Sequence, residues 1–167
     1  GLVLGNCKLL YKNGSGSFAR VYRACSLENG KMVGLKVLRE RLATDSQTVY
    51  QFHREAELCK KLSHKNIVPI FDVARHADYH YFTMEFIEGE TSQDLVDREG
   101  RLPLLYALEI TRQVARALSA AERHDIVHRD IKPSNIMLTP EADGEMIVKL
   151  IDFGIAKSPK QQGEHTQ

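Results

Sequence analysis

The sequence predicts an α+β fold with a β-rich first part and a helical second part. Short β-rich segments separated by turns run from Lys8 to Leu38. Apolar residues recur at three- and four-residue spacing in Thr48–Leu62, which is typical of an amphipathic helix. A long helix is predicted from Pro103 to Arg123, with proline in its first turn.

The bulk composition limits the class of protein. The chain has 167 residues, 43% hydrophobic and 27% charged, which is enough for one domain with a core. A net charge of +1 gives no reason to expect binding to nucleic acid or to an anionic membrane. No apolar run approaches the roughly 20 residues that span a bilayer. The three cysteines match no disulfide or zinc pattern, so we expect a reducing, cytoplasmic location.

Residues 8–24 are predicted to form a strand, a glycine turn and a second strand. The turn follows the pattern Gly-x-Gly-x-x-Ala-x-Val from Gly14 to Val21. Glycines let the backbone approach phosphate oxygens and expose N–H donors, although a plain Gly/Ser hairpin fits equally well. A dinucleotide-binding turn tolerates the same pattern but requires a helix after it. The β-rich segment Arg20–Cys25 argues against that helix.

Met32–Leu38 is predicted to be an apolar strand that contains one lysine, Lys36. A lysine that protects an edge strand from aggregation is one interpretation. We favour a phosphate-binding lysine, because the strand follows the glycine turn by one hairpin, with its turn at Glu28–Lys31.

The next segments are predicted to be a helix and two strands. The helix buries five apolar residues, Val49, Phe52, Ala56, Cys59 and Leu62. Strands are predicted at Ile67–Val73 and Tyr79–Phe86, with a turn around Ala77. His64 is expected to cap a turn, and the seven histidines show no paired spacing for a metal site.

Two short motifs near the end of the sequence carry the most specific signal. Residues 128–135 follow H-R-D-x-K-P-x-N, and 22 residues after Asp130 the D-F-G motif begins at Asp152. Either motif alone can arise by chance, but both occur here in order, downstream of a glycine turn and a strand lysine. From about Leu9 to Lys157 the chain resembles eukaryotic-type (Hanks-type) Ser/Thr protein kinases, and is most similar to the bacterial ones.

The resemblance implies a protein-kinase-like fold. Residues 1–87 would be the small lobe with glycine loop, strand lysine, C-helix and hinge, and residues 88–157 the start of the large lobe. Residues 158–167 would begin the activation loop, and we expect them to be flexible. The A-P-E motif and the helices that follow it in the family have no counterpart here. We therefore expect the N-terminal part of a catalytic domain, and the activity of this chain itself stays open.

The resemblance also implies the catalytic residues. Asp130 would orient or accept the proton of the incoming hydroxyl, and Lys132 would lie near the γ-phosphate. Asn135 and Asp152 would hold Mg²⁺. Glu55 would be the C-helix glutamate that pairs with Lys36, with Glu57 as the competing candidate.

A nucleotide pocket is implied by the same resemblance. Ala19 stands where the family has a third glycine, which should not prevent ATP binding. Thr91 and Asp94 lie where a ribose or substrate contact falls, although a helix cap explains them as well. The implied ATP-binding residues are Gly14, Ser15, Gly16, Ser17, Phe18, Val21, Gly34, Lys36, Met84, Glu85, Ile87 and Met137.

A packed column and a phosphorylation switch are further implications. Cys59, Ile70, His128 and Phe153 would stack as the apolar column of active kinases. Arg129 suggests an activation loop that is ordered by phosphorylation, at Ser158 or Thr166.

The expected partners are ATP and a protein substrate that presents Ser or Thr, with no nucleic acid and no membrane segment in this chain. We also expect self-association through apolar surface on the Pro103–Arg123 helix. A nucleotide-binding pseudokinase or scaffold is the main alternative. Against a decayed site, the chain keeps all of Lys36, Glu55, Asp130, Asn135 and Asp152. A dinucleotide-dependent oxidoreductase is a weaker alternative.

Overall fold

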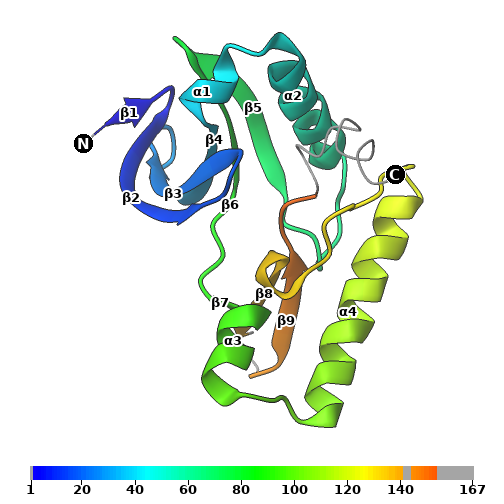
Figure 1. Cartoon of the computed structure of the whole chain (residues 1–167). Coiled ribbons are helices and arrows are strands. Elements are labelled where there is room, and N and C mark those ends of the chain that lie inside the picture. Colours follow the sequence, from blue (N-terminus) through cyan, green and yellow to red (C-terminus); the bar gives the residue numbers. More distant parts are fainter. Residues whose placement is uncertain (1, 141–143, 154–167) are drawn as a thin grey trace, which may run out of the picture.

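The computed structural model describes residues 2–140 and 144–153 and contains two lobes (Figure 1). A β-sheet with two helices forms the first lobe, and two helices with a small sheet form the second. Residues 86–89, which we call the hinge segment, connect the lobes. The predicted activation-loop start at residues 158–167 and Gly154 of the D-F-G motif lie outside the described residues.

The first lobe is built on a six-stranded antiparallel sheet with the spatial order β1-β2-β3-β4-β6-β5. Val21 lies opposite Lys36 on the neighbouring strand, and Gly34 lies opposite Met84 on the next. The register therefore places the predicted phosphate and adenine residues side by side. The strands are β1 (Val3–Leu4), β2 (Cys7–Ser15), β3 (Ala19–Ser26), β4 (Met32–Leu38), β5 (Ile70–His76) and β6 (Tyr79–Glu85).

Helices α1 (Glu40–Ala43) and α2 (Ser46–Lys60) accompany this sheet. Asp45 caps α2, because its carboxylate accepts hydrogen bonds from two backbone N–H groups of the first turn. This cap starts the helix two residues before the predicted position. Phe52 packs on Phe82 of the sheet, with ring centroids 5.4 Å apart. The burial of this face fixes α2 against the strands that carry the predicted pocket.

The prediction of a strand from Ile67 was wrong at its start. Pro69 lacks an N–H donor, and β5 begins only after it. The residues before the proline pair with the second lobe, since Val68 donates to the carbonyl of Leu150 at 3.0 Å. The backbone N–H of Leu150 in turn donates to the carbonyl of Asn66 at 2.9 Å. This segment therefore joins the lobes instead of extending the sheet.

The second lobe contains β7 (Glu90–Thr91), α3 (Ser92–Glu99), α4 (Leu104–Glu122), a 3₁₀ turn η1 (Pro133–Asn135), β8 (Ile136–Pro140) and β9 (Met146–Leu150). Its three strands form an antiparallel sheet in the order β7-β8-β9, which the sequence did not predict. Strands β8 and β9 follow the catalytic motif and precede Asp152. The hairpin of β8 and β9 therefore accounts for the sequence spacing between the catalytic motif and the D-F-G motif.

Helix α4 packs one face against the second lobe and leaves apolar residues exposed on its first turns. Ile110, Val114 and Ala117 are buried. Leu104 and Leu105 are 73% and 80% exposed, as expected for an apolar surface on this helix. Pro103 is the N-cap, one residue before the predicted position in the first turn. No helix within the described residues combines the length and apolar character that a membrane span requires.

A buried hydrogen-bond network ties α4 to β9. The side-chain oxygen of Gln113 accepts from the Val148 N–H at 2.9 Å and from the Asn66 amide at 2.7 Å. Its nitrogen donates to the Met146 carbonyl at 2.9 Å. The Asn66 amide also donates to the Val148 carbonyl at 2.8 Å. Asn66 and Gln113 are buried, so these side chains bind β9 through its backbone much as a neighbouring strand would.

Replacing Gln113 by methionine should destabilise the fold. The change keeps the side-chain volume but removes the oxygen that accepts from the Val148 N–H and the Asn66 amide. Each buried donor left unsatisfied should lower the free energy of unfolding by about 1–3 kcal/mol. Urea unfolding measures the loss. Gln93→Met is the matched control, because Gln93 bonds Asp97 on exposed surface, and its cost should stay within about 0.5 kcal/mol. Equal stabilities for both variants would contradict the role given to the network.

Candidate active site

An ion pair between Lys36 and Asp152 closes the space between the lobes. The ammonium of Lys36, on β4, contacts the carboxylate of Asp152, which follows β9. The two side chains are 12% and 33% exposed, so the pair is only partly screened by solvent. Asp152 has a φ of +55°, which is uncommon for a residue other than glycine. The surrounding contacts must therefore hold its backbone in place.

These contacts come from the catalytic motif. The backbone N–H of Ile151 donates to the Asn135 carbonyl at 3.0 Å. The His128 Nε2 lies 3.1 Å from the Ile151 carbonyl oxygen. Both bonds act on the residue directly before Asp152. The two motifs that the sequence places 22 residues apart are thus joined by hydrogen bonds.

Asp130, Lys132 and Asn135 form a compact group, as the motif predicts. The Lys132 ammonium lies 3.0 Å from Oδ2 of Asp130. The Asn135 amide nitrogen donates to the backbone oxygen of Asp130 at 2.8 Å and to its Oδ2 at 3.1 Å. Arg129 takes a φ of +61°, which turns the chain sharply before the acid. Asp130 is therefore oriented by an ammonium and an amide at once.

His128 is a packing residue in this site. It is 2% exposed, and its ring lies 4.6 Å from that of Phe153. Burial lowers the pKa of His128, so the neutral ring is favoured. Cys59, Ile70 and Phe153 belong to the same buried cluster, as the predicted column requires. Burial raises the pKa of Cys59 to about 12, which makes this thiol a neutral core group.

The predicted ion pair between Lys36 and Glu55 is not present among the described residues. Lys36 pairs with Asp152 instead. Glu55 lines a cavity of about 320 Å³ between α2 and the segment before Asp130, together with Arg54 and Arg129. Burial raises the pKa of Glu55 to about 7, and Arg129, Arg54 and Lys36 oppose that rise. The position of α2 thus leaves Glu55 among three cations without a salt bridge to Lys36.

The glycine turn is held by two arginines that the sequence analysis did not single out. Arg39 Nε donates to the Gly16 carbonyl at 2.8 Å, and its Nη2 donates to the Ser15 hydroxyl at 2.8 Å. Arg41 donates to the Ser17 carbonyl at 2.7 Å. Phe18 at the tip is 39% exposed. A basic residue after a strand looks like ordinary surface in the sequence, so no signal identified these contacts.

The predicted adenine pocket lies along β3, β4 and the hinge segment. A Cβ on Gly34 would stand 3.1 Å from side-chain atoms of Met84, so this methionine occupies the space that glycine leaves. The carboxylate of Glu85 pairs with Lys149 of β9. Ile87 packs against the main core, and Val21 does so from β3.

Two other predicted residues lie in the second lobe. Met137 is half-buried on β8, opposite Lys149 of β9. Thr91 and Asp94 form a capping box at the start of α3, which confirms the cap interpretation. Their side chains bond one another, with the Thr91 hydroxyl 2.7 Å from Oδ2 of Asp94. His64 accepts a bond from the Asn66 N–H at 3.1 Å, so it caps a turn as expected.

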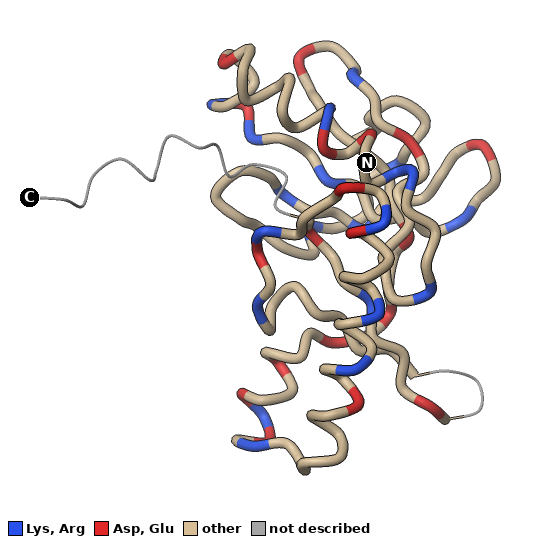
Figure 2. The backbone as a smooth tube through the Cα atoms, turned by 90° about the vertical axis from the view of Figure 1, so that its right-hand side faces the viewer, with Lys and Arg blue, Asp and Glu red and all other residues tan. Residues whose placement is uncertain are grey.

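Charges of both signs are interspersed over the two lobes (Figure 2). The electrostatics of the site therefore come from individual partners and not from a surface of one sign. A strand lysine, two carboxylates and an amide gathered between two lobes are the groups that phosphoryl transfer uses.

Comparison with known proteins identifies the family. Residues 8–167 match the family described as "Protein kinase domain". The chain is 38% identical over 159 residues to "Probable serine/threonine-protein kinase CPE1738" of Clostridium perfringens, covering 95% of this chain and 23% of that protein. It is 36% identical over 154 residues to the serine/threonine-protein kinase PrkC of Bacillus subtilis, covering 92% and 23%. The kinase domain of PknI from Mycobacterium tuberculosis matches the structure with a TM-score of 0.80 and 29% identity, covering 95% of this chain and 64% of that one.

The chain therefore belongs to the protein kinase family and carries the N-terminal part of a catalytic domain. It spans about a quarter of the length of the curated relatives it matches. Members of this family use ATP, generally with a divalent metal, to phosphorylate proteins.

Glu55 should make stability depend on pH in a defined window. Its pKa is about 7 in the folded state against an ordinary 4.5, so folding favours the protonated acid. The stabilisation is complete below about pH 4.5 and is lost as the pH rises through about 7. Relative to Glu55→Gln, the parent should therefore lose stability between these values, as measured by urea unfolding across pH. Glu57→Gln, an exposed change on the same helix, should show the same dependence of stability on pH as the parent. If Glu55→Gln also showed the parent's pH dependence, Glu55 would not be the group responsible for it.

Proposed function

We propose that this chain is the ATP-binding part of an active serine/threonine protein kinase that transfers the γ-phosphate of ATP to Ser or Thr hydroxyls of proteins. One observation carries the proposal: Lys36, Asp152, Asp130 and Asn135 are joined into a single site by ion pairs and hydrogen bonds. Each of these groups is present and bonded to a neighbour, which favours an active kinase over a decayed site.

Asp130 is the group that would receive the acceptor hydroxyl. Its Oδ2 already faces the Lys132 ammonium and the Asn135 amide, so its orientation is fixed before substrate arrives. A hydroxyl that donates to this carboxylate would give up its proton there as it attacks the γ-phosphate. Lys132, which is exposed beside Asp130, would meet the γ-phosphate and offset its charge.

Asn135 and Asp152 fit a hard divalent cation. The Asn135 amide nitrogen makes both bonds to Asp130, which directs the amide oxygen to the other side. That oxygen and the Asp152 carboxylate are the donor types that Mg²⁺ prefers, with phosphate and water completing the shell. Within residues 2–140 and 144–153 no group of three or more His, Cys, Asp or Glu side chains is placed to hold a metal ion. Bound Mg²⁺ would neutralise phosphate charge.

Lys36 would exchange partners when nucleotide binds. Its ammonium now neutralises Asp152, and Glu55 lies close enough for Lys36 to lower its pKa. With Asp152 engaged on a cation, Lys36 would turn to the phosphates and Glu55 would become its carboxylate partner. Glu55, half-protonated near pH 7, would ionise as this pair forms.

The nucleotide would lie between the glycine turn and the hinge segment. Backbone N–H groups from Gly14 to Phe18 would contact phosphates, and Val21, Gly34 and Met137 would enclose the adenine. The Glu85 carbonyl and the Ile87 backbone would bond its edge, beside Met84.

Residues 1–87 and 88–157 would then be the small lobe and the start of the large lobe, with the activation loop beginning after them. The free thiols of Cys7, Cys25 and Cys59 support a cytoplasmic location for this domain.

Substitution of Asp130 tests the proposed transfer. Asp130→Asn keeps the shape but removes the charge that orients the hydroxyl, so transfer of ³²P from labelled ATP to Ser or Thr of a protein should fall by about 10²–10⁴. Asp125→Asn is the matched control, because Asp125 is exposed and asparagine tolerates its positive φ. ATP binding with no transfer in the parent would favour the pseudokinase or scaffold alternative.

We further propose that the domain self-associates through the exposed apolar residues Leu104, Leu105 and Leu108 of α4. Light scattering should show a mass that rises with concentration and returns to the monomer in Leu105→Glu. A monomer at high concentration in the parent would contradict this.

A further inference from the structure

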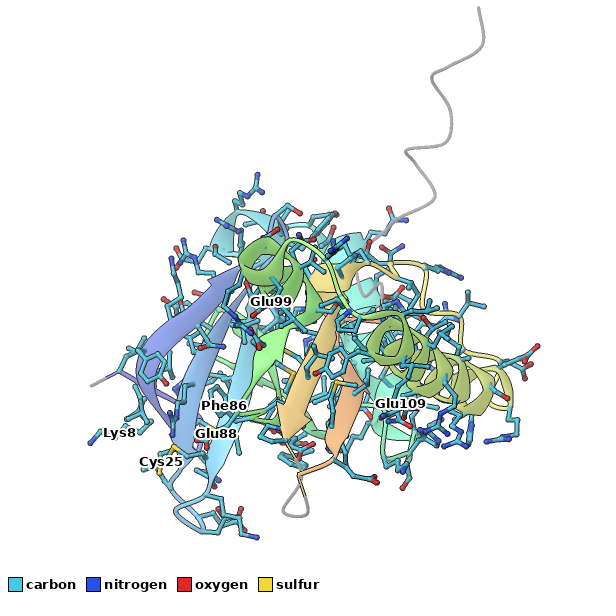
Figure 3. All side chains as sticks on the ribbon, turned by 90° about the horizontal axis from the view of Figure 1, so that it is seen from below. Lys8, Cys25, Phe86, Glu88, Glu99 and Glu109 are labelled. Atoms are coloured by element: carbon cyan, nitrogen blue, oxygen red, sulfur yellow. The ribbon has the colours of Figure 1, made fainter. Side chains whose placement is uncertain are left out.

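Arg23 lies at the point where the glycine hairpin meets the hinge segment. It stands on β3 two residues after Val21, so both side chains face the same side of the sheet. In register it lies opposite Gly34, which lies opposite Met84. Figure 3 shows Phe86 and Glu88 of the hinge segment beside strands β2 and β3. Arg23 therefore occupies the outer end of the row of residues that would enclose the adenine.

The guanidinium of Arg23 contacts three residues in two separate segments, β2 and the hinge segment. Nη1 donates to the Tyr11 hydroxyl on β2 at 2.9 Å, and Nη2 pairs with Oε1 of Glu88 at 3.2 Å. Its central carbon lies 4.9 Å from the ring centroid of Phe86 and 5.7 Å from that of Tyr11. One side chain thus connects β2 and β3 with the hinge segment.

The physical character of these contacts matters more than their number. Glu88 is 75% exposed, so the ion pair alone contributes little. The flat guanidinium can lie over an aromatic ring and use its fork at the same time, which lysine cannot do. The Arg23 Nε is buried without a hydrogen-bond partner among the described residues. The position of the side chain is therefore set at its outer end, by Tyr11, Phe86 and Glu88.

We propose that Arg23 is a positioning residue for the adenine end of the nucleotide. By tying the hairpin to the hinge segment, it fixes the gap between Val21, which would cover the adenine, and the backbone of Glu85–Ile87, which would bind its edge. The inference rests on the proposed ATP site. It goes beyond that site, because Arg23 touches no part of the machinery assigned to transfer.

This role concerns the adenine end of the nucleotide and not its phosphate end. The phosphate end depends on Lys36 and on the glycine turn. That turn is held by Arg39 and Arg41 and not by Arg23. Loss of Arg23 should therefore weaken a ligand that carries adenine and leave a ligand that is only phosphate unaffected. A purely structural role would weaken both ligands together.

Calorimetric titration of the whole protein with ATP and with inorganic tripolyphosphate, each with Mg²⁺, tests whether Arg23 affects only the ligand that carries adenine. Arg23→Leu should raise the Kd of ATP about threefold to tenfold and change that of tripolyphosphate less than twofold. Arg23→Lys keeps the charge but loses the flat face, so it should recover part of the affinity. Glu88→Gln should have a smaller effect in the same direction and add little to Arg23→Leu.

Arg20→Leu is the matched control, because Arg20 is exposed on the same strand and faces away from Val21. It should leave both affinities unchanged. Equal losses for ATP and tripolyphosphate in Arg23→Leu, or no loss for either, would overturn the inference while leaving the proposed function intact. If Arg23→Leu does not fold, unchanged ATP affinity in both Arg23→Lys and Glu88→Gln would overturn it. A parent protein that binds neither ligand would overturn both proposals.

Discussion

The placement of strand β9 is the constraint on which the rest of the site depends. Asn66 and Gln113, from the first-lobe junction and from α4, bind the backbone of β9 in a buried position. Leu150 then pairs with the carbonyl of Asn66, so the chain leaves the sheet in a fixed direction. Two residues later this direction delivers Asp152 to Lys36. A polar network in the core thus determines where the charges of the cleft meet.

The catalytic motif depends on the same strand. His128 and Asn135 bond the backbone of Ile151, so the loop that carries Asp130 and the end of β9 hold each other. The charged groups of the first lobe are held differently. Lys36 reaches Asp152 by charge, and Glu55 remains among cations beside a cavity. The second-lobe groups are therefore preorganised, whereas the pairing of Lys36 is the part that nucleotide binding would change.

Sequence reasoning identified the residues whose chemistry is encoded locally. Asp130, Lys132 and Asn135 fall within one short motif, and their contacts follow from that spacing. Strands β2 to β6 and both long helices were predicted, apart from shifts set by the Asp45 cap and by Pro69, whereas the small sheet of the second lobe was not.

The missed features depend on residues that are distant in sequence. Gln113 meets Val148, and Arg23 meets Glu88, only after the chain has folded, and neither belongs to a periodic pattern. The partner of Lys36 in this structure, Asp152, differs from the predicted Glu55 for the same reason. Glu55 and Asp152 are both suitable carboxylates, and the choice between them depends on where α2 lies relative to β4.

We infer that the Lys36–Asp152 pair marks a metal-dependent nucleotide site. Thermal unfolding with ATP, with and without Mg²⁺, tests it most directly in the parent and in Asp152→Asn. At about 100 times Kd, nucleotide should stabilise the parent by roughly 2.7 kcal/mol, or about 5–10 °C for a domain of this size. Mg²⁺ should increase this shift in the parent and add nothing to it in Asp152→Asn. An equal gain from Mg²⁺ in both proteins would contradict it.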